Sequence, residues 1–447
     1  MELFGTAGIR GPVTEVTPDL AVRVGRAAAT AAEGGEFVVA RDGRETGDAL
    51  AAAVASGLLA GGAAVRRAGM LPTPALALAS RGRRGVMVTA SHNPPADNGL
   101  KLFVDGEEYD RAAERAVRDR VDAPVVDWDR WGGAERTDVL ERYRRAVTDY
   151  AAGHGADADG LTVAVDCGSG VAGLATPQVL TSLGAEVRAL NATVDGHFPA
   201  RQSKPTPESL ADLRAFVADG ADLGVGHDGD ADRVVVVDGD GEVVHEDTVL
   251  AILAEHYTRA SDAVDPVVVT TPNASGRVDE RVRAAGGRVE RVRLGALHEG
   301  VASARADGDE RTEVTFAAEP WKHIHPRLGG WIDGVASAGV FARLVAAEGL
   351  DALRAPVTER PYRKESVPCP DDRKAAAMAE LEGGLPEVFP EATVDTDHGV
   401  RLDLPDGSWT LVRPSGTEPY VRVYAESEDV DALVATVREV VEAAVRT

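Results

Sequence analysis

The chain has 447 residues, which at about 100 to 200 residues per domain corresponds to three or four domains. It carries 48 Lys and Arg against 73 Asp and Glu, a net charge of −25, and a surface of this sign repels nucleic acid and anionic lipid. We therefore expect no nucleic acid partner and no membrane partner, and a phosphorylated ligand must be attracted by a local basic pocket or a metal ion.

A unit of strand, turn, helix, glycine and strand recurs three times along the chain. Its first strands are the apolar runs at residues 37–40 (FVVA), 161–166 (LTVAVD) and 266–271 (PVVVTT). Short apolar strands that alternate with helices are typical of βαβ units in a mostly parallel sheet. The repeat therefore predicts three related mixed α/β domains, with cores built from Ala, Val and Leu because only 4 % of the residues are aromatic.

The last part of the chain has a different order of elements. A strand-like segment (ESVPC) and a helical segment (DDRKAAAMAELE) precede two strands around a turn (SWTLVR and YVRVYAE) and a C-terminal helix. This order predicts an α+β domain. We expect the four domains to span residues 1–152, 153–246, 247–356 and 357–447.

The first motif along the chain is FGTAGIRG at residues 4–11, in which three glycines surround Arg10. Glycine has no Cβ, so the backbone can approach a ligand closely there. By itself, this motif indicates a binding site only weakly.

The second motif, VTASHNPPADNGLKLF, places Ser91 on a loop stiffened by two prolines and Lys101 in the strand that follows. A serine hydroxyl is a poor nucleophile unless it is activated or already carries the group to be transferred. His92 is adjacent, but neighbouring side chains diverge in extended backbone, which argues against a Ser91–His92 dyad. An ordinary Pro-stiffened turn is the alternative.

The glycine-rich sequence at residues 168–173 (GSGVAG) follows a strand and matches the dinucleotide-binding fingerprint. That fingerprint requires an acidic residue at the end of the next strand, where this sequence has Ala189, Leu190 and Asn191. A nucleotide-binding protein built on this turn is therefore the less favoured alternative. No GK[ST] sequence of a P-loop occurs, so a P-loop nucleotide is not the expected phosphoryl donor.

The sharpest signal is GHDGDADR, in which Asp228, Asp230 and Asp232 occupy alternate positions between two apolar strands. Alternate side chains of an extended loop point the same way, and two like charges about 4 Å apart repel by roughly 4 kcal/mol. A hard divalent cation such as Mg²⁺ removes this repulsion. A calcium EF-hand would need Gly and Glu where the sequence has Arg233 and Gly239. A solvated acidic turn is the alternative.

The last motif, RPSGTEPYVR, lies between two strands near the C-terminus. Ser415, Gly416 and Thr417 offer backbone N–H and hydroxyl groups that suit phosphate oxygens. Arg413 and Arg422 flank the turn and can each bind a phosphate through two hydrogen bonds. The same residues also fit an ordinary hairpin turn.

TASHNP, DGDADR and RPSGTEP, in this order and opened by FGTAGIRG, resemble the motifs of the α-D-phosphohexomutases across the whole chain. Members of that family have three mixed α/β domains and one α+β domain around a central active-site cleft, which agrees with the repeats above. The resemblance implies an isomerase, specifically an intramolecular phosphotransferase, that acts on a small phosphosugar.

The resemblance also implies a phosphoserine mechanism. Ser91 is expected to carry the phosphoryl group, and one oxygen of this group completes a Mg²⁺ site formed by Asp228, Asp230 and Asp232. Phosphorylated Ser91 gives its phosphoryl group to a sugar monophosphate, which becomes a sugar 1,6-bisphosphate. The bisphosphate then turns around and gives its other phosphoryl group back to Ser91. The same bisphosphate is expected to serve as an activator.

Other roles follow from the same resemblance. Lys101 and Arg10 resemble the basic residues beside the transferring group, and His92 is a candidate proton shuttle. The residues expected to bind the substrate are Arg233 and the phosphate clamp, Arg413, Ser415, Gly416, Thr417 and Arg422.

One loop departs from the family pattern. The sugar-selecting loop often reads Gly-Glu-x-Ser-Gly-His, whereas residues 318–323 read AEPWKH. Glu319 and His323 align with the family residues and are expected to bind sugar hydroxyls. Trp321 and Lys322 replace two small residues, and Trp321 either contacts the sugar or packs beneath the loop.

Glucosamine phosphate is the expected substrate, because a chain that opens directly with FGTAGIRG resembles the phosphoglucosamine mutases and their archaeal relatives. Phosphomannomutase or phosphoglucomutase activity is the alternative, and a phosphopentomutase or a phosphatase acting through Ser91 is less favoured. A phosphatase would need the acidic loop but has no use for a second phosphate clamp.

Composition also bears on the environment of the protein. Only five of the 48 basic residues are lysine, and an acid excess with few lysines predicts a halophilic archaeon, although a GC-rich genome also favours Arg. Cys167 and Cys369 are too few for a disulfide framework or a zinc site. No signal-like segment and no run of 18 apolar residues occurs, so we expect a cytoplasmic protein, either a monomer or a homodimer.

Overall fold

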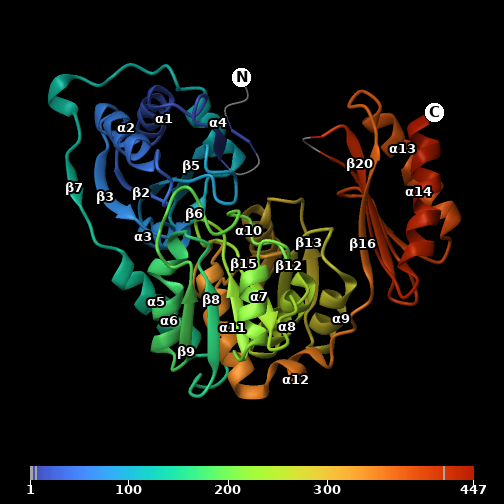
Figure 1. The fold of residues 1–447 in the computed structure, drawn as a ribbon. Coiled ribbons are helices and arrows are strands. Elements are labelled where there is room, and N and C mark those ends of the chain that lie inside the picture. The colour runs from blue at the N-terminus through green and yellow to red at the C-terminus, as the bar shows by residue number, and fades with distance from the viewer. Residues whose placement is uncertain (1–3, 6–7, 416–417, 447) are drawn as a thin grey trace. The chain divides into compact units, whose positions relative to one another are not determined.

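The computed structural model describes residues 4–5, 8–415 and 418–446 of the chain (Figure 1). The chain forms two compact units. Unit 1 consists of residues 1–249 and 320–353, and unit 2 consists of residues 250–319 and 354–447. The chain therefore passes from one unit to the other three times. Within the described ranges, no helix is both long enough and apolar enough to cross a membrane.

The N-terminal part of unit 1 is built on a mixed sheet with the order β1-β5-β4-β2-β3-β7, and β6 pairs with β5. β2 is parallel to β3 and β4, whereas β5 is antiparallel to β4 and β1. The strands are β1 (Ile9–Pro12), β2 (Glu36–Arg41), β3 (Ala64–Met70), β4 (Arg84–Val88), β5 (Asp97–Val104), β6 (Glu107–Glu108) and β7 (Ala134–Arg136). The helices are α1 (Pro18–Ala31), α2 (Gly47–Ala60), α3 (Thr73–Ala79), α4 (Arg111–Arg118) and α5 (Leu140–Ala152), with a 3₁₀ turn at Trp128–Arg130.

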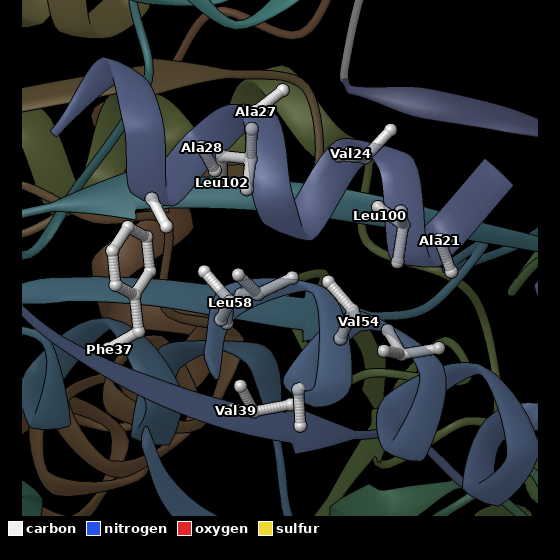
Figure 2. Packing of buried hydrophobic residues seen from close by; sticks show 14 of the residues in the cluster. Ala21, Val24, Ala27, Ala28, Phe37, Val39, Val54, Leu58, Leu100 and Leu102 are labelled. Carbon is white, nitrogen blue, oxygen red and sulfur yellow. The ribbon is translucent and has the colours of Figure 1, made fainter. Parts of the chain in front are cut away.

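Helices α1 and α2 pack against each other and against this sheet through small and branched side chains (Figure 2). Gly25 and Gly57 allow the close helix contact, since a Cβ on Gly57 would lie 2.0 Å from the carbonyl oxygen of Val22. The hydroxyl of Thr17 caps α1 by accepting the N–H of Leu20 at 3.3 Å. The core is formed largely by Ala, Val and Leu, as the few aromatic residues predict.

The second sheet of unit 1 has the order β11-β10-β8-β9, in which β8 is parallel to its two neighbours. The motif GHDGDADR forms the loop between β10 and β11, which are antiparallel. The strands are β8 (Thr162–Asp166), β9 (Glu186–Leu190), β10 (Leu223–Gly226) and β11 (Val235–Asp238), and the helices are α6 (Thr176–Ser182) and α7 (Ala211–Ala218), with a 3₁₀ turn at Val171–Leu174.

The returning segment of unit 1, residues 320–353, contributes β15 (Lys322–Ile324) and α11 (Gly334–Glu348). α11 packs against α5 and α6. The hydroxyl of Tyr143 donates to Asp333 Oδ1 at 2.8 Å, and Arg343 Nη1 lies 2.7 Å from Asp157 Oδ1. These contacts bind a segment that is distant in sequence to the rest of unit 1.

Unit 2 contains a parallel sheet in which β13, β12 and β14 are neighbours in that order, and an antiparallel sheet with the order β16-β20-β19-β18-β17. α13 and α14 cover one face of the antiparallel sheet. The strands are β12 (Asp265–Thr270), β13 (Arg288–Arg291), β14 (Thr312–Glu319), β16 (Tyr362–Pro368), β17 (Thr393–Asp395), β18 (Val400–Asp403), β19 (Trp409–Pro414) and β20 (Tyr420–Glu426). The helices are α9 (Gly276–Ala284), α10 (Leu297–Asp307), α13 (Lys374–Val388) and α14 (Val430–Arg446), with α8 (Glu246–Arg259) and α12 (Leu350–Arg354) at the unit boundaries.

The predicted fold class is confirmed: three mixed α/β sheets with helices are followed by an α+β segment. Each of the four expected ranges holds the strands of one sheet. The division into two units differs from these ranges, because β15 and α11 of the third range belong to unit 1. The exact domain boundaries stay predictions.

Candidate active site

Ser91 lies on the loop between β4 and β5, in unit 1. Its backbone is in the left-handed region, with φ 52°, and the residue is only 1 % exposed. The Ser91 N–H donates to Thr89 Oγ1 at 2.8 Å, and the hydroxyl donates to Asp228 Oδ2 at 2.7 Å. A non-glycine residue keeps such a conformation, which costs about 1 to 3 kcal/mol, only where its surroundings enforce it.

Arg44 holds much of the loop around Ser91 in place. It is 1 % exposed and lies in the turn after β2. Its guanidinium donates to four backbone carbonyl oxygens of the serine loop at 2.6 to 2.9 Å, those of Ser91, Asn93, Pro94 and Asp97. One side chain thus fixes both sides of the loop that carries the candidate nucleophile.

Asp42 completes this brace. Its Oδ2 accepts hydrogen bonds from Arg44 Nε at 3.1 Å and from Thr89 Oγ1 at 2.7 Å. Burial raises the pKa of Asp42 to about 6, against the opposing effect of the Arg44 charge. The buried Asp42 carboxylate therefore links Arg44 to Thr89, and the Thr89 hydroxyl in turn accepts the N–H of Ser91.

The acidic loop brings three carboxylates together. Asp228, Asp230 and Asp232 are each at most 2 % exposed, and one oxygen from each lies within 4.8 Å of the other two. Gly229 allows this loop to approach the serine loop, because a Cβ there would lie 2.8 Å from the carbonyl oxygen of Ser91. The structure thus places the hydroxyl and the three carboxylates in one buried cluster.

The charged groups of this cluster shift the pKa values of one another. Burial and the neighbouring carboxylates Asp232 and Asp230 raise the pKa of Asp228 well above its ordinary value. Although burial alone would raise the pKa of Asp232, the cations Lys101, Lys322 and Arg233 hold it below its usual range. Lys101 Nζ lies 2.9 Å from Asp232 Oδ2 and 3.5 Å from Asp230 Oδ2.

The carboxylates fit a hard divalent cation. Among the described residues, the buried oxygens Asp230 Oδ1 and Asp232 Oδ1 have no hydrogen-bond partner. Asp230 is oriented by Thr73, whose hydroxyl donates to Asp230 Oδ2 at 2.6 Å. Buried oxygens without partners are costly, and Mg²⁺ takes oxygen ligands of this kind. These residues could therefore hold the expected Mg²⁺, with Asp228 as the third carboxylate.

His92 lies closer to the nucleophile than the sequence argument allowed. Its Nδ1 is 3.3 Å from Ser91 Oγ, because the left-handed backbone at Ser91 is not extended and does not separate the two side chains. Burial, with the charges of Arg233 and Arg10, lowers the pKa of His92 to about 2. The imidazole is therefore neutral, and so low a pKa makes it a weak base as long as no anion is added beside it. Arg10, in β1 opposite Gly99 of β5, is half-buried, and its buried Nε has no hydrogen-bond partner among the described residues.

The returning segment places part of the expected sugar loop in unit 1. Trp321 has φ 69° and packs against the core of the second sheet, with Lys204 Nζ 5.9 Å from its ring. Trp321 is half-buried, and whether it also contacts the sugar stays a prediction. Lys322 forms an isolated β-bridge with Arg233, which brings it beside the acidic cluster.

The two aligned residues of that loop have different surroundings. His323 is 1 % exposed, and its Nδ1 lies 3.0 Å from Ser337 Oγ of α11. Glu319 is half-buried at the end of β14 and belongs to unit 2. Sugar binding by either residue stays a prediction.

The expected phosphate clamp lies in unit 2, between β19 and β20. Arg413 and Arg422 are direct cross-strand partners. Like charges in this position destabilise a sheet by roughly 0.2 to 1 kcal/mol. Within the part of the chain that the structure describes, the buried atoms Arg413 Nε, Arg422 Nε and Ser415 Oγ have no hydrogen-bond partner. An anion would satisfy these groups and offset the repulsion.

The other two expected clamp residues, Gly416 and Thr417, lie outside the described residues. On both sides of them the loop is held by Lys374, at the start of α13. Lys374 Nζ donates to the carbonyl oxygens of Ser415 and Glu418, each at 2.6 Å. The clamp therefore has a positioning lysine as well as two arginines.

The glycine-rich turn at residue 168 has a structural use in unit 1. The guanidinium of Arg201 covers Gly168, and a Cβ there would lie 2.7 Å from Arg201 Nη2. Arg201 also pairs with Asp166 at 2.7 Å and donates to the carbonyl oxygen of His227 at 2.7 Å. The turn packs directly against Gly229, so it supports the acidic loop.

Comparison with known proteins identifies the family. Models of the phosphoglucomutase/phosphomannomutase family match residues 1–125 (alpha/beta/alpha domain I), 141–241 (alpha/beta/alpha domain II) and 366–443 (C-terminal domain). The chain belongs to this family. Enzymes of the phosphoglucomutase/phosphomannomutase family are isomerases that transfer a phosphoryl group within a sugar, and this chain is such an enzyme.

Individual relatives agree with this assignment. A phosphopentomutase of Thermococcus kodakarensis is 41 % identical over 440 residues, covering 96 % of this chain and 94 % of the relative. A probable phosphoglucosamine mutase of Methanopyrus kandleri is also 41 % identical over 440 residues, covering 95 % and 94 %. A crystal structure of a phosphoglucomutase/phosphomannomutase family protein from Burkholderia thailandensis matches with a TM-score of 0.85 and 26 % identity, over 99 % of this chain and 96 % of that one.

Several contacts in this phosphoglucomutase/phosphomannomutase family member were not predicted from the sequence. The brace of Arg44 and Asp42 reaches a loop about fifty positions away, and the contacts of Thr73 and Lys374 are also long-range. The only signal for the brace is RDGR at residues 41–44, where charged residues directly follow a buried strand. Charged residues at the end of a parallel strand are a recurrent feature of binding sites, so this signal could have been used.

Proposed function

We propose that this enzyme is a phosphosugar mutase that acts through a phosphorylated Ser91. The observation that supports it most is the buried Ser91 hydroxyl, 2.7 Å from Asp228, in a loop fixed by Arg44. In the first half-reaction, the bond between the phosphoryl group and Ser91 Oγ breaks while one forms to a sugar hydroxyl oxygen, which loses its proton. In the second, Ser91 Oγ takes the other phosphoryl group of the sugar bisphosphate, and the serine is phosphorylated again.

The residues of the chain have distinct tasks in this proposal. A Mg²⁺ ion held by the three aspartates would neutralise charge on the transferring phosphoryl group. Lys101 and Arg10 add positive charge beside it. His92, whose Nδ1 lies 3.3 Å from Ser91 Oγ, is the proposed proton shuttle, and the phosphoryl anion on Ser91 would have to raise its low pKa for it to take the proton of the sugar hydroxyl. The basic loop with Arg413 and Arg422 binds the phosphate that does not react. A sugar 1,6-bisphosphate is the proposed activator, because it restores phosphate to a dephosphorylated Ser91.

For the sugar, we propose glucosamine phosphate, interconverted between its 6- and 1-phosphates. Its support is that seven curated relatives, 33 to 41 % identical to this chain, carry the name probable phosphoglucosamine mutase. A pentose phosphate is the second candidate, supported by the name of the Thermococcus relative and by Lys322. Lys322 lies close enough to Asp232 and His92 to act on their charges, and it would repel a 2-ammonium group near the reacting C1.

A substrate panel tests this proposal. The 6-phosphates of glucosamine, glucose and mannose and ribose 5-phosphate are compared by kcat/KM at fixed Mg²⁺ and high salt, with the sugar bisphosphate as primer. We expect the largest value for glucosamine phosphate, whereas a larger value for ribose 5-phosphate would establish the second candidate. Inorganic phosphate is measured in the same samples, because release at the rate of turnover would identify a phosphatase instead.

A further inference from the structure

The first sheet of unit 1 carries a cavity that the proposed mechanism does not use. Its volume is about 500 Å³, which is in the range of small-molecule sites. It lies where β2, β3 and β7 approach their carboxyl ends, next to the first turns of α2. Three arginines line it, Arg41 at the end of β2, Arg67 in β3 and Arg136 at the end of β7.

Strand register forces two of these arginines together. β3 and β7 are parallel, and Arg67 is the direct partner of Arg136. Neighbouring like charges in a sheet are unfavourable. At the preceding position of the same two strands, Arg66 instead faces Glu135 at 2.6 Å. The Arg67–Arg136 pair is therefore a local exception to the charge pairing of this sheet edge.

Protein groups leave these charges largely unneutralised. Among the described residues, no hydrogen bond or ion pair is formed by the guanidinium groups of Arg67 and Arg136. Both residues are exposed, so water rather than a protein group solvates these two charges. Arg41 Nε lies 3.5 Å from Asp48 Oδ1, but the Asp48 side chain is 89 % exposed, so this pair contributes little. Asp48 is also the one acidic residue that lines the cavity. In a chain with a net charge of −25, three arginines around one cavity are a marked concentration of positive charge.

The rest of the lining indicates what else the ligand carries. Between the charges the walls are apolar, formed by Val39, Ala40, Ala51, Ala52 and Ala68. The first turns of α2 also line the cavity, through Asp48, Ala51 and Ala52. Arginine forks match the oxygens of a phosphate group, and apolar walls match an uncharged organic part.

We propose that this cavity binds a small phosphorylated organic molecule through Arg41, Arg67 and Arg136, at a site distinct from the Ser91 loop. The two sites are joined through the backbone, since Arg41 precedes Asp42 and its Nη1 donates to the Asp42 carbonyl oxygen at 3.0 Å. An anion held by Arg41 therefore lies one residue from the brace that fixes Ser91. The proposal does not rest on the identity of the sugar.

Calorimetric titration of the full chain tests the site, with phenyl phosphate and inorganic phosphate as probes, at the lowest salt that keeps the protein folded. We expect the double variant R67Q/R136Q to bind phenyl phosphate at this site about tenfold to a hundredfold more weakly than the wild type, because it loses charge-assisted hydrogen bonds. R422Q, altered in unit 2, should keep this binding event. Tighter binding of phenyl phosphate than of inorganic phosphate identifies an organic ligand, and the reverse identifies free phosphate.

The matched control is R145Q/R188Q, which removes two exposed arginines elsewhere in unit 1. It should bind both probes as the wild type does. Identical titrations for R67Q/R136Q and the wild type, or an equal loss in the control, would overturn the proposal. R67Q/R136Q should melt no lower than the wild type, since it removes a repulsive pair, so a loss of binding cannot be ascribed to unfolding. In crystals soaked with selenate, the anomalous selenium peak should lie between the three guanidinium groups, with the selenate oxygens within hydrogen-bond distance of them.

Discussion

At the scale of single residues, the position of Ser91 is determined by groups that do not react. The left-handed backbone turns its hydroxyl toward Asp228, and Arg44 holds the loop carbonyls so that this conformation persists. In the proposed mechanism this orients the hydroxyl before any substrate binds, which lowers the barrier of the phosphoryl transfer.

Replacement of Ser91 by alanine should abolish nearly all mutase turnover while the protein stays folded, because the methyl side chain cannot carry a phosphoryl group. Intact-mass and peptide analysis of freshly purified wild type should show one phosphoryl group on Ser91, absent in the variant. Turnover of S91A close to the wild-type rate would refute the proposed mechanism.

Arg44→Lys should lower kcat by about tenfold to a hundredfold with little change in KM, because a lysine ammonium cannot reach four carbonyl oxygens and a carboxylate together. Arg44→Ala should also destabilise the protein by about 3 to 5 kcal/mol, since it leaves Asp42 buried and unpaired. The double variant R44A/D42N should recover much of that stability but not kcat. If KM rises while kcat stays unchanged in R44K, Arg44 contacts substrate and does not position Ser91.

Asp230→Asn should weaken Mg²⁺ binding and activity together, because one of three anionic ligands becomes neutral. Calorimetry with Mg²⁺ and activity as a function of Mg²⁺ concentration measure the two effects. Asp122→Asn serves as a control, since the Asp122 side chain is 81 % exposed and, among the described residues, belongs to neither group that could hold a metal ion. Wild-type activity of D230N across the Mg²⁺ titration would show that this loop is not the metal site.

At the scale of elements, strands and their turns were predictable and the contacts between loops were not. Apolar runs followed by turn residues (Gly43, Gly168 and Asn273) mark β2, β8 and β12 correctly, because a buried strand has an unbroken apolar sequence. The acidic motif was placed between two strands for the same reason. The sequence does not show that Arg44 reaches Ser91 or that Thr73 orients Asp230, since these contacts depend on how separate loops pack in three dimensions.

The β19–β20 connection provides a prediction of its own. Arg422→Ala should raise KM more than it lowers kcat, with a loss of about tenfold to a hundredfold in kcat/KM, because the proposed partner of Arg422 is the phosphate that does not react. Arg438→Ala, on the exposed side of α14, is the matched control and should leave both constants unchanged. A wild-type KM for R422A would remove this loop from the substrate site.

The segment from β15 to α11 predicts acid sensitivity. Burial lowers the pKa of His323 to about 3 and that of His325 well below its ordinary value, and both rings lie about 3 Å from the Ser337 hydroxyl. In the unfolded chain both histidines take up protons below about pH 6.5, but in the folded chain they do not. The unfolded state therefore binds more protons, and stability falls as the pH falls.

From about pH 6.5 downward, the free energy of unfolding should decrease by about 1.4 kcal/mol per pH unit for each of these histidines, until the pH approaches the folded-state pKa values. Urea unfolding at a series of pH values measures the slope. The variant H325Q should lose one histidine's share of it, whereas H197Q, altered at a side chain that is 74 % exposed, should not. An unchanged slope in H325Q would contradict the assignment.

At the scale of the whole molecule, the net charge of −25 makes the folded state repel itself at low ionic strength. Salt shortens the screening length from about 10 Å at 0.1 M to about 3 Å at 1 M. The melting temperature should therefore rise as KCl is increased over this range and then level off, because screening saturates. Calorimetric melting in KCl checks this, and a melting temperature independent of KCl would argue against adaptation to high salt.

The return of residues 320–353 to unit 1 has a consequence for the order of folding during synthesis. Unit 1 contains the serine loop and the acidic loop, yet its last helix, α11, ends at Glu348, about a hundred residues after the first part of the unit is complete at residue 249. Chains grow at roughly 5 to 20 residues per second, so the nascent unit waits several seconds or more with the α5 and α6 surface uncovered. A polypeptide that stops at residue 249 would keep this surface exposed and lack the partners of Tyr143 and Asp157. The ribosome must therefore synthesise the chain at least as far as α11 before unit 1 can be completed.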